Sequence, residues 1–101
     1  MAELTSKTIS AQNTFTDPIK IQSSYFSLSL QGLTDSIVTV QKSYDTNAPT
    51  NWIDVDTFTT SSEEVGFDPE NVYYRAGIKT GNYGSDTVTI RFGGGDLSWM
   101  T

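Results

Sequence analysis

Hydrophobic and polar residues alternate along most of this chain, and a period of two residues predicts β-strands. The alternation is clearest in residues 24–32, where Phe26, Leu28 and Leu30 lie on one side and serine or glutamine on the other. A strand with one apolar and one polar face is typical of an antiparallel sheet. No window has the 3.6-residue period of an amphipathic helix, so we expect an all-β chain.

Turn-forming residues divide this pattern into six or seven short strands, the first at residues 7–11. The side chains expected to face inward are Ile19 and Ile21; Phe26, Leu28 and Leu30; Val38, Val40 and Tyr44; Ile53 and Val55; Val72, Tyr74, Ala76 and Ile78; and Val88, Ile90 and Phe92. The face opposite Ile53 and Val55 is expected to carry Trp52, Asp54, Asp56 and Phe58. Residues 61–71 contain Gly66 and Pro69, which favour a loop or a short edge strand. The spacing predicts a single antiparallel β-sandwich, Ig-like or jelly-roll-like.

The mid-chain stretch SYDTNAPTNWIDVDTF allows three interpretations: a sugar-binding element, a cation site and a turn. As a sugar-binding element it would follow the Asp-box pattern Ser-x-Asp-x-Gly-x-x-Trp, but the glycine is absent and the spacing to Trp52 is too long. As a cation site, Asp45 and Asn47 are spaced like the first ligands of a calcium loop, and Asp54 and Asp56 are expected to share one strand face. The later glycine, the bidentate glutamate and the flanking helices of such a loop are missing. As a turn, residues 45–51 cap a β-hairpin, because Asp and Asn bond their own backbone and proline fixes φ. The sequence favours the hairpin.

The two ends of the chain depart from the strand pattern. We expect an N-terminal arm at residues 1–6, the β-sandwich domain at residues 7–93 and a C-terminal arm at residues 94–101. Three glycines at 93–95 predict a flexible hinge, and Leu97, Trp99 and Met100 follow it. We expect these apolar side chains to dock on the domain, on a neighbouring copy or on a larger partner, or else to end the chain in disorder.

Charge and composition narrow the classes of function. The 101 residues have a net charge of −6, and the six basic residues are scattered, so neither nucleic acid nor an anionic membrane surface is an expected partner. No apolar run approaches the roughly 18 residues of a membrane span, and no signal peptide is visible. The chain has no cysteine and no histidine, which excludes disulfides, thiolate chemistry and the commonest transition-metal ligand. We expect no metal and no cofactor.

Catalysis would have to rest on carboxylates, hydroxyls or lysine. The paired carboxylates are Glu63 with Glu64 and Asp54 with Asp56, and paired carboxylates are typical of glycosidases. A glycosidase also needs a sizeable cleft, which a domain of this length rarely provides. No Gly-x-Ser-x-Gly elbow and no Ser-x-x-Lys motif occurs. We therefore expect no enzymatic activity and no catalytic residue.

Several aromatic side chains fall on or near the face opposite the expected core: Tyr25, Trp52, Phe58, Tyr73 and Tyr83. Three interpretations stay open for them, namely packing against a second layer, a protein interface, and a platform on which sugar rings stack. Arg75 and Lys79 are expected to form cross-strand pairs with acidic residues. The residues expected to bind a partner are Trp52, Phe58, Tyr73, Tyr83, Leu97, Trp99 and Met100.

Three segments form a recognisable pattern across residues 36–93: TVQKSYDTNAPTNWIDVDTFT, YRAGIKTGNY and TVTIRFG. They resemble small virion proteins of tailed bacteriophages, whose pattern is a TVxVQRSxD strand, a Trp-x-x-Val hairpin return, YRxGxKTGxY and a closing TVTVRxG strand. Asn47-Ala48-Pro49 replaces the glycine-containing hairpin variants, so the loop departs from the family. The resemblance implies a structural role in the capsid, tail or neck, and it carries over no catalytic residue.

We therefore expect a non-enzymatic virion protein that decorates or cements the capsid and is made in the host cytoplasm. It would bind the major capsid protein or another virion protein and would self-associate, with a trimer as one arrangement. The alternative is a tail- or fibre-associated adhesion or carbohydrate-binding module. Its sugar platform would consist of Trp52, Phe58 and Tyr83, with Asp54 and Asp56 holding calcium.

Overall fold

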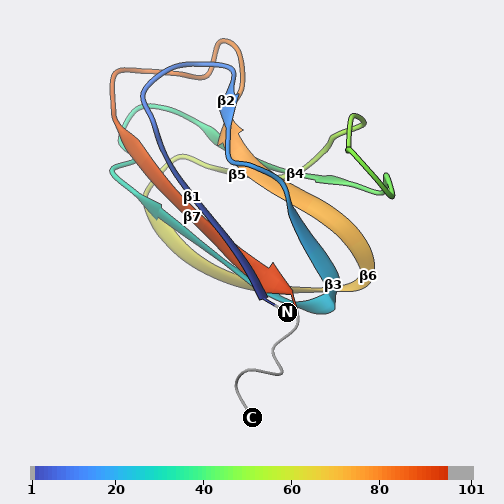
Figure 1. The fold of residues 1–101 in the computed structure, drawn as a ribbon. Helices are drawn as coiled ribbons and strands as arrows, with labels where there is room; N and C mark the ends of the chain where they lie inside the picture. Colours follow the sequence, from blue (N-terminus) through green and yellow to red (C-terminus); the bar gives the residue numbers. More distant parts are fainter. Residues whose placement is uncertain (1, 96–101) are drawn as a thin grey trace.

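The structure is a computed structural model that describes residues 2–95, and its regular elements are strands (Figure 1). They are β1 (Ala2–Ile9), β2 (Thr14–Phe15), β3 (Ile19–Gln31), β4 (Val38–Ser43), β5 (Ile53–Phe58), β6 (Ser62–Ile78) and β7 (Val88–Gly95). No helix occurs among the described residues, so the expectation of an all-β chain is confirmed. All strand pairs are antiparallel.

The strands form one hydrogen-bonded sheet in the order β1-β7-β3-β6-β4-β5, and β2 pairs with β6. Strands β3 and β6 are long, and each takes part in both halves of this sheet. In the first half, residues 24–31 of β3 lie between β7 and residues 62–68 of β6. In the second half, residues 71–78 of β6 pair with β4 and β2 and with the start of β3, and β5 is the outermost strand. Figure 1 shows β3 and β6 curving together through the molecule.

A bulge marks the place where β3 and β6 pass from one half to the other. The register shifts between Gln22 and Ser24, and Ser23 between them has a positive φ of 51°. On β6 this position lies opposite Pro69 and Glu70, and Pro69 has no N–H to donate to a ladder. Bulges bend a strand and move its side chains by one position, because strand side chains alternate. The bulge explains why odd-numbered residues of β3 are buried before it and even-numbered residues after it.

The core lies on the inner side of the curved sheet, and the buried hydrophobic side chains from both halves form one cluster. Burying a large aliphatic or aromatic side chain contributes about 1.5–3 kcal/mol, so this cluster is the main source of stability. Most side chains expected to face inward belong to the cluster or, as Phe26 does, pack against it. The exceptions are Tyr44, Ile53 and Val55, all of which are exposed.

The expected faces of Asp56 and Phe58 on β5 are wrong, because a second irregularity lies between Val40 and Gln41 of β4. Val40 pairs with Asp56 and Gln41 pairs with Asp54, so Val55 has no partner in the register. The extra residue moves Asp56 to the same side as buried Val40. In the same way, Phe58 lies opposite Val38 and packs against the core. Asp54 and Asp56 therefore lie on opposite faces.

Both expected arm boundaries need correction. Strand β1 begins at Ala2 and pairs with β7 along its whole length, so residues 2–6 belong to the sheet. The three glycines at 93–95 are not a free hinge, because β7 runs through them and pairs with β1 and β3. A Cβ at Gly94 would lie 2.5 Å from Ile21 Cδ1 and 3.0 Å from Phe26 Cβ, so glycine permits close packing here. Residues 96–101, with Leu97, Trp99 and Met100, lie outside the described residues.

Candidate protein-binding site at the free edge of β6

The hairpin interpretation of residues 45–51 is confirmed, because β4 and β5 pair on either side of this loop. The Asp45 carboxylate accepts hydrogen bonds from the backbone N–H groups of Thr50 at 2.7 Å and Asn51 at 3.0 Å. These bonds lower the pKa of Asp45 to about 2. The carboxylate therefore holds the turn. Within residues 2–95, no group of three Asp, Glu, His or Cys side chains could hold a metal ion.

The acidic residues weighed for catalysis have separate structural partners. Asp54 accepts hydrogen bonds from Lys79 Nζ at 2.7 Å and Gln41 Nε2 at 2.8 Å, and these two side chains lower the pKa of Asp54. The expected cross-strand partner of Lys79 is thus confirmed as Asp54. Glu63 accepts hydrogen bonds from Ser29 Oγ at 2.6 Å and from Gln31 Nε2 at 2.8 Å. Asp56 and Glu64 lie elsewhere, on the inner side of the sheet.

Two further aspartates join the loops before β4 and β7. Asp86 accepts hydrogen bonds from the backbone N–H of Thr34, and from both the N–H and the hydroxyl of Ser36. Asp35 in turn accepts bonds from the N–H and the hydroxyl of Ser85. Desolvation raises the pKa of Asp86, but the hydrogen bonds outweigh it and leave the pKa well below its usual range.

A largely buried polar cluster lies where β3 and β6 bend. The Asp68 carboxylate accepts hydrogen bonds from the Tyr74 hydroxyl at 2.8 Å, Lys42 Nζ at 3.1 Å and the Glu70 N–H at 3.0 Å. Desolvation raises the pKa of Asp68, yet these three donors outweigh it and lower the pKa overall. A hydrogen bond with Tyr44 is the largest cause of the raised pKa of Lys42. This cluster stabilises the bend, and sequence reasoning assigned no role to Asp68.

The aromatic residues expected to bind a partner are spread over several packing environments. Trp52 stacks on the Arg75 guanidinium, 4.4 Å from ring centre to Cζ, and Phe15 also stacks on this guanidinium at 4.1 Å. Phe58 and Tyr83 pack against the core. The remaining ring, Tyr73, is half-buried, and Lys20 Nζ lies 6.0 Å from its centre. The structure therefore does not bring these rings to one flat exposed platform.

A different set of apolar side chains is exposed together on the outer side of the first half. These residues, which we call the outer patch, are Val65 (78% exposed), Leu4 (63%), Tyr25 (55%) and Phe67 (52%). Val65 pairs with Ser27 of β3. On its other side, Ser27 pairs with Gly93 of β7, and Gly93 in turn pairs with Leu4 of β1. The small side chain of Ser27 and the lack of one at Gly93 leave a hollow of about 300 Å³ between the two apolar ends of this row.

The other two members of the outer patch form the neighbouring row. Tyr25 pairs with Phe67 in the register, and their ring centres are 4.9 Å apart with the planes tilted by 58°. Tilted aromatic pairs at this spacing attract each other, so the pair is held in place while it stays exposed to water. Exposed apolar side chains that gather in one place are typical of interaction surfaces.

Val65 and Phe67 also lie on a free strand edge. Residues 62–68 of β6 pair with β3 on one side, whereas the pairing of β6 with β4 begins only at Tyr73. Among the described residues no strand covers the other side of 62–68. An uncovered edge presents backbone N–H and C=O groups that another strand can bind. Strand β5 ends the sheet on its other side and has a free edge as well.

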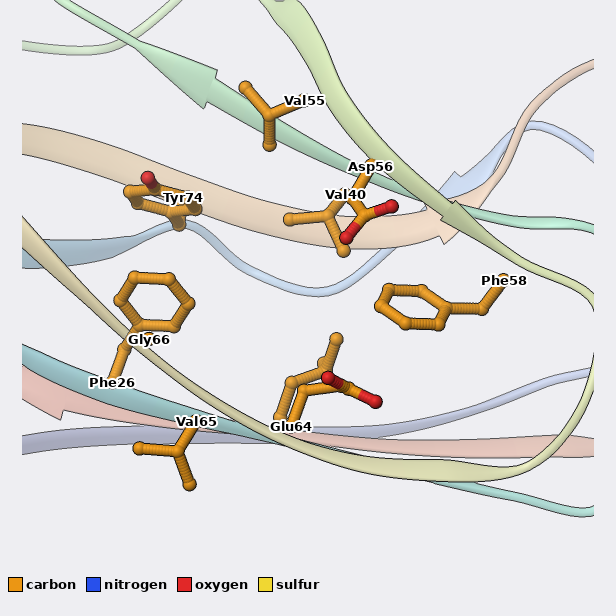
Figure 2. Close-up of a pocket in the computed structure, with 10 residues that line it drawn as sticks. Phe26, Val40, Val55, Asp56, Phe58, Glu64, Val65, Gly66 and Tyr74 are labelled. Atoms are coloured by element: carbon orange, nitrogen blue, oxygen red, sulfur yellow. The ribbon is translucent and has the colours of Figure 1, made fainter.

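An open groove lies between these two free edges, on the inner side of the sheet (Figure 2). We call it the inner groove, and its volume is about 260 Å³. The lining residues are Phe26, Leu28, Val40, Val55, Asp56, Phe58, Glu64, Val65, Gly66 and Tyr74. Figure 2 shows Asp56 and Glu64 entering it from opposite sides, with the Phe58 ring beside them. The groove is largely apolar, and its carboxylates come from the two edge strands.

Comparisons with protein-family models, with curated proteins and with solved structures return no match to this chain. Of the outer patch, sequence reasoning singled out Tyr25 as an exposed aromatic and missed Leu4, Val65 and Phe67. A signal was present, because Val65 and Phe67 are two residues apart in the segment that was expected to be a loop or a short edge strand. Had that segment been read as a full strand, the two side chains would have been assigned to one face.

Proposed function

We propose that this chain is a non-enzymatic structural protein of a tailed-phage virion, which decorates or cements the capsid. It binds the major capsid protein or another virion protein through the free edge of β6 and the outer patch. The observation that carries this proposal is the coincidence of an unpaired strand edge with four exposed apolar side chains. The phage setting rests on the sequence resemblance across residues 36–93.

We also propose that the curved sheet is a β-sandwich, in which the two halves are the layers. The long strands β3 and β6, which bend at Ser23 and Pro69, support this interpretation. So does the single core cluster, which draws side chains from both halves. Strand pairs that cross from one layer to the other at a bulge are typical of such architectures.

A binding role suits the chemistry of the site better than catalysis does. The carboxylates of Asp45, Asp54, Asp68 and Asp86 are engaged in turns, ion pairs and loop contacts. The inner groove, at about 260 Å³, is smaller than the roughly 300–1,000 Å³ of typical small-molecule sites. Covering Val65 and Phe67 with a partner, by contrast, is favourable, because their exposed apolar surface then leaves water.

The test uses particles of the phage that encodes this chain, with its own copy deleted and the protein added back. The double variant Val65→Ser/Phe67→Ser should bind the particles at least about tenfold more weakly than the unchanged protein, because it loses two apolar contacts. The matched control is Thr57→Ser/Thr59→Ser, at exposed residues of β5 and the loop that follows it. Equal occupancy of the particles by both variants would contradict the proposal, as would absence of the unchanged protein from purified particles.

The second candidate is a tail- or fibre-associated carbohydrate-binding module, and the exposed Tyr25–Phe67 ring pair is the feature that favours it. Sugar rings stack on such exposed aromatic faces. A glycan array with and without calcium separates the two functions. Binding that is lost in Tyr25→Ala would support the module, and an empty array alongside particle binding would support the virion role.

A further inference from the structure

Two carboxylates occupy positions where an edge strand normally points apolar side chains at the core. Asp56 of β5 pairs with buried Val40, and Glu64 of β6 pairs with buried Leu28. Paired residues in a sheet point to the same side, so both carboxylates face the inner groove. Figure 2 shows them reaching toward the space between the two strands.

Neither carboxylate has a cationic partner in the part of the chain that the structure describes. Asp56 accepts a hydrogen bond from the N–H of its neighbour Thr57 at 2.9 Å. Glu64 accepts one from the Ser62 hydroxyl. The ion pairs formed by Lys42 and Lys79 use other aspartates, Asp68 and Asp54. The inner groove therefore presents two negative charges that are solvated in the free protein.

The floor of the groove is hydrophobic and firmly packed. The Phe26 ring lies 4.8 Å from the Tyr74 ring, centre to centre, and 5.7 Å from that of Phe92. It also lies directly against the backbone at Gly66, where an added Cβ would clash with the ring. The Phe58 ring lines the opposite side of the groove, so aromatic side chains flank the space next to the two carboxylates.

We propose that the inner groove binds a lysine or arginine side chain carried by an extended strand of the partner protein. Such side chains lay their aliphatic stem on apolar surface and keep the charged head among acceptors. In the groove, the stem would contact Phe26 and Phe58, and the head would lie between Asp56 and Glu64. A volume of about 260 Å³ suits one side chain with a few waters.

The backbone of the same strand would pair with one of the two free edges. In strand addition, main-chain hydrogen bonds provide affinity, and pockets for alternate side chains provide specificity. A basic residue facing the groove would then have apolar neighbours two residues away on the same face. This inference rests on the proposed function, because it names the chemistry of the partner at that edge.

The negative charge of the groove disfavours two other occupants, a second copy of the chain and residues 96–101. A second copy would bring its own acidic edge strands, with Asp54, Asp56, Glu63 and Glu64, against those of the first. Like charges placed opposite each other destabilise a strand pair. Residues 96–101 of the chain include Asp96 and no basic residue, so they offer no counter-charge. A heterologous strand with Lys or Arg is the complementary partner.

The probe is the acetylated, amidated peptide Thr-Val-Thr-Arg-Thr-Val-Thr, titrated into ¹⁵N-labelled full-length protein to millimolar concentration. We expect amide shifts confined to residues 53–58 and 62–68. The isosteric double variant Asp56→Asn/Glu64→Gln should weaken binding about tenfold, with each charge contributing about threefold. The control Glu63→Gln removes a carboxylate from the outer side of the same strand and should change the affinity less than twofold.

Several outcomes would overturn the inference. They are equal binding of peptides with central Gln or Glu, an equal loss of affinity in Glu63→Gln, and no shift at 53–58 or 62–68 at millimolar peptide. So would binding that increases when residues 96–101 are deleted, because that segment would then occupy the groove. If Asp56→Asn/Glu64→Gln leaves particle occupancy unchanged while Val65→Ser/Phe67→Ser lowers it, this inference fails and the proposed function stands. If the peptide binds as expected but neither variant affects particles, the proposed function fails alone.

Discussion

Replacing Asp68 with asparagine tests whether the polar cluster holds the bend of β3 and β6. The Asp68 side chain is 5% exposed and that of Lys42 is 19% exposed, so their ion pair is largely shielded from water. Asparagine can still accept the Glu70 N–H, but it loses the charge that binds Tyr74 and Lys42. Hydrogen bonds to a charged group contribute about 1.5–3 kcal/mol each, and breaking a buried ion pair costs about 3–5 kcal/mol.

From these values we expect Asp68→Asn to lower the free energy of unfolding by about 3 kcal/mol at pH 7. In a domain of this size the melting temperature should fall by about 12–24 °C. Urea unfolding followed by tryptophan fluorescence and by circular dichroism measures the change. The control Asp17→Asn, at an exposed position before β3, should change stability by less than about 0.5 kcal/mol.

The difference in free energy of unfolding between the unchanged protein and Asp68→Asn should depend on pH. The direction of the Asp68 pKa shift predicts how. The pKa of Asp68 is lowered in the folded state, so its contribution is complete above the unfolded value of about 3.9. This contribution to stability is lost as the pH falls from the unfolded pKa through the pKa of the folded state. The difference in free energy of unfolding between the unchanged protein and Asp68→Asn should therefore become smaller below about pH 4. A loss under about 1 kcal/mol at pH 7, or a difference that stays constant down to pH 2, would refute this account of the bend.

Three smaller predictions concern local packing. Gly94→Ala should destabilise the fold by about 1–3 kcal/mol, because the new Cβ meets Ile21 inside a packed core; unchanged urea stability would contradict this close packing. The carboxyl carbon of Asp45 should titrate in NMR with a midpoint of about 2, and a midpoint near 4 would mean that the turn bonds are absent in solution. Trp52→Ala should cost about 1 kcal/mol by removing one stacking face of Arg75, and thermal unfolding at low and high salt would show whether that contact contributes.

The alternation of side chains predicted the inner residues well wherever the pairing is regular. The alternate residues from Val72 to Ile78 and from Val88 to Phe92 face the core as expected, since no irregularity interrupts these stretches. Asp56 and Phe58 of β5 were assigned to the wrong face because one unpaired residue, Val55, shifts the alternation there. Such a bulge depends on the partner strand and leaves no mark in the hydrophobic pattern of β5 itself.

The candidate site was harder to predict for a related reason. Residues 62–68 carry two glutamates, Gly66 and a following proline, which are loop signals when the chain is read alone. Their extended conformation comes from pairing with distant β3, so tertiary contacts override local preference. The outer patch also joins residues from three strands, β1, β3 and β6, and only the strand order brings Leu4 near Val65.

The proposed binding to the virion is tested most directly by a cryo-microscopy map of the phage particle with this protein in place. If the protein binds through the free edge of β6, the map will show density of another virion subunit against Val65 and Phe67, and a strand of that subunit alongside residues 62–68. A map in which these side chains face solvent in every copy, or in which the protein is absent from the particle, would contradict the proposed binding.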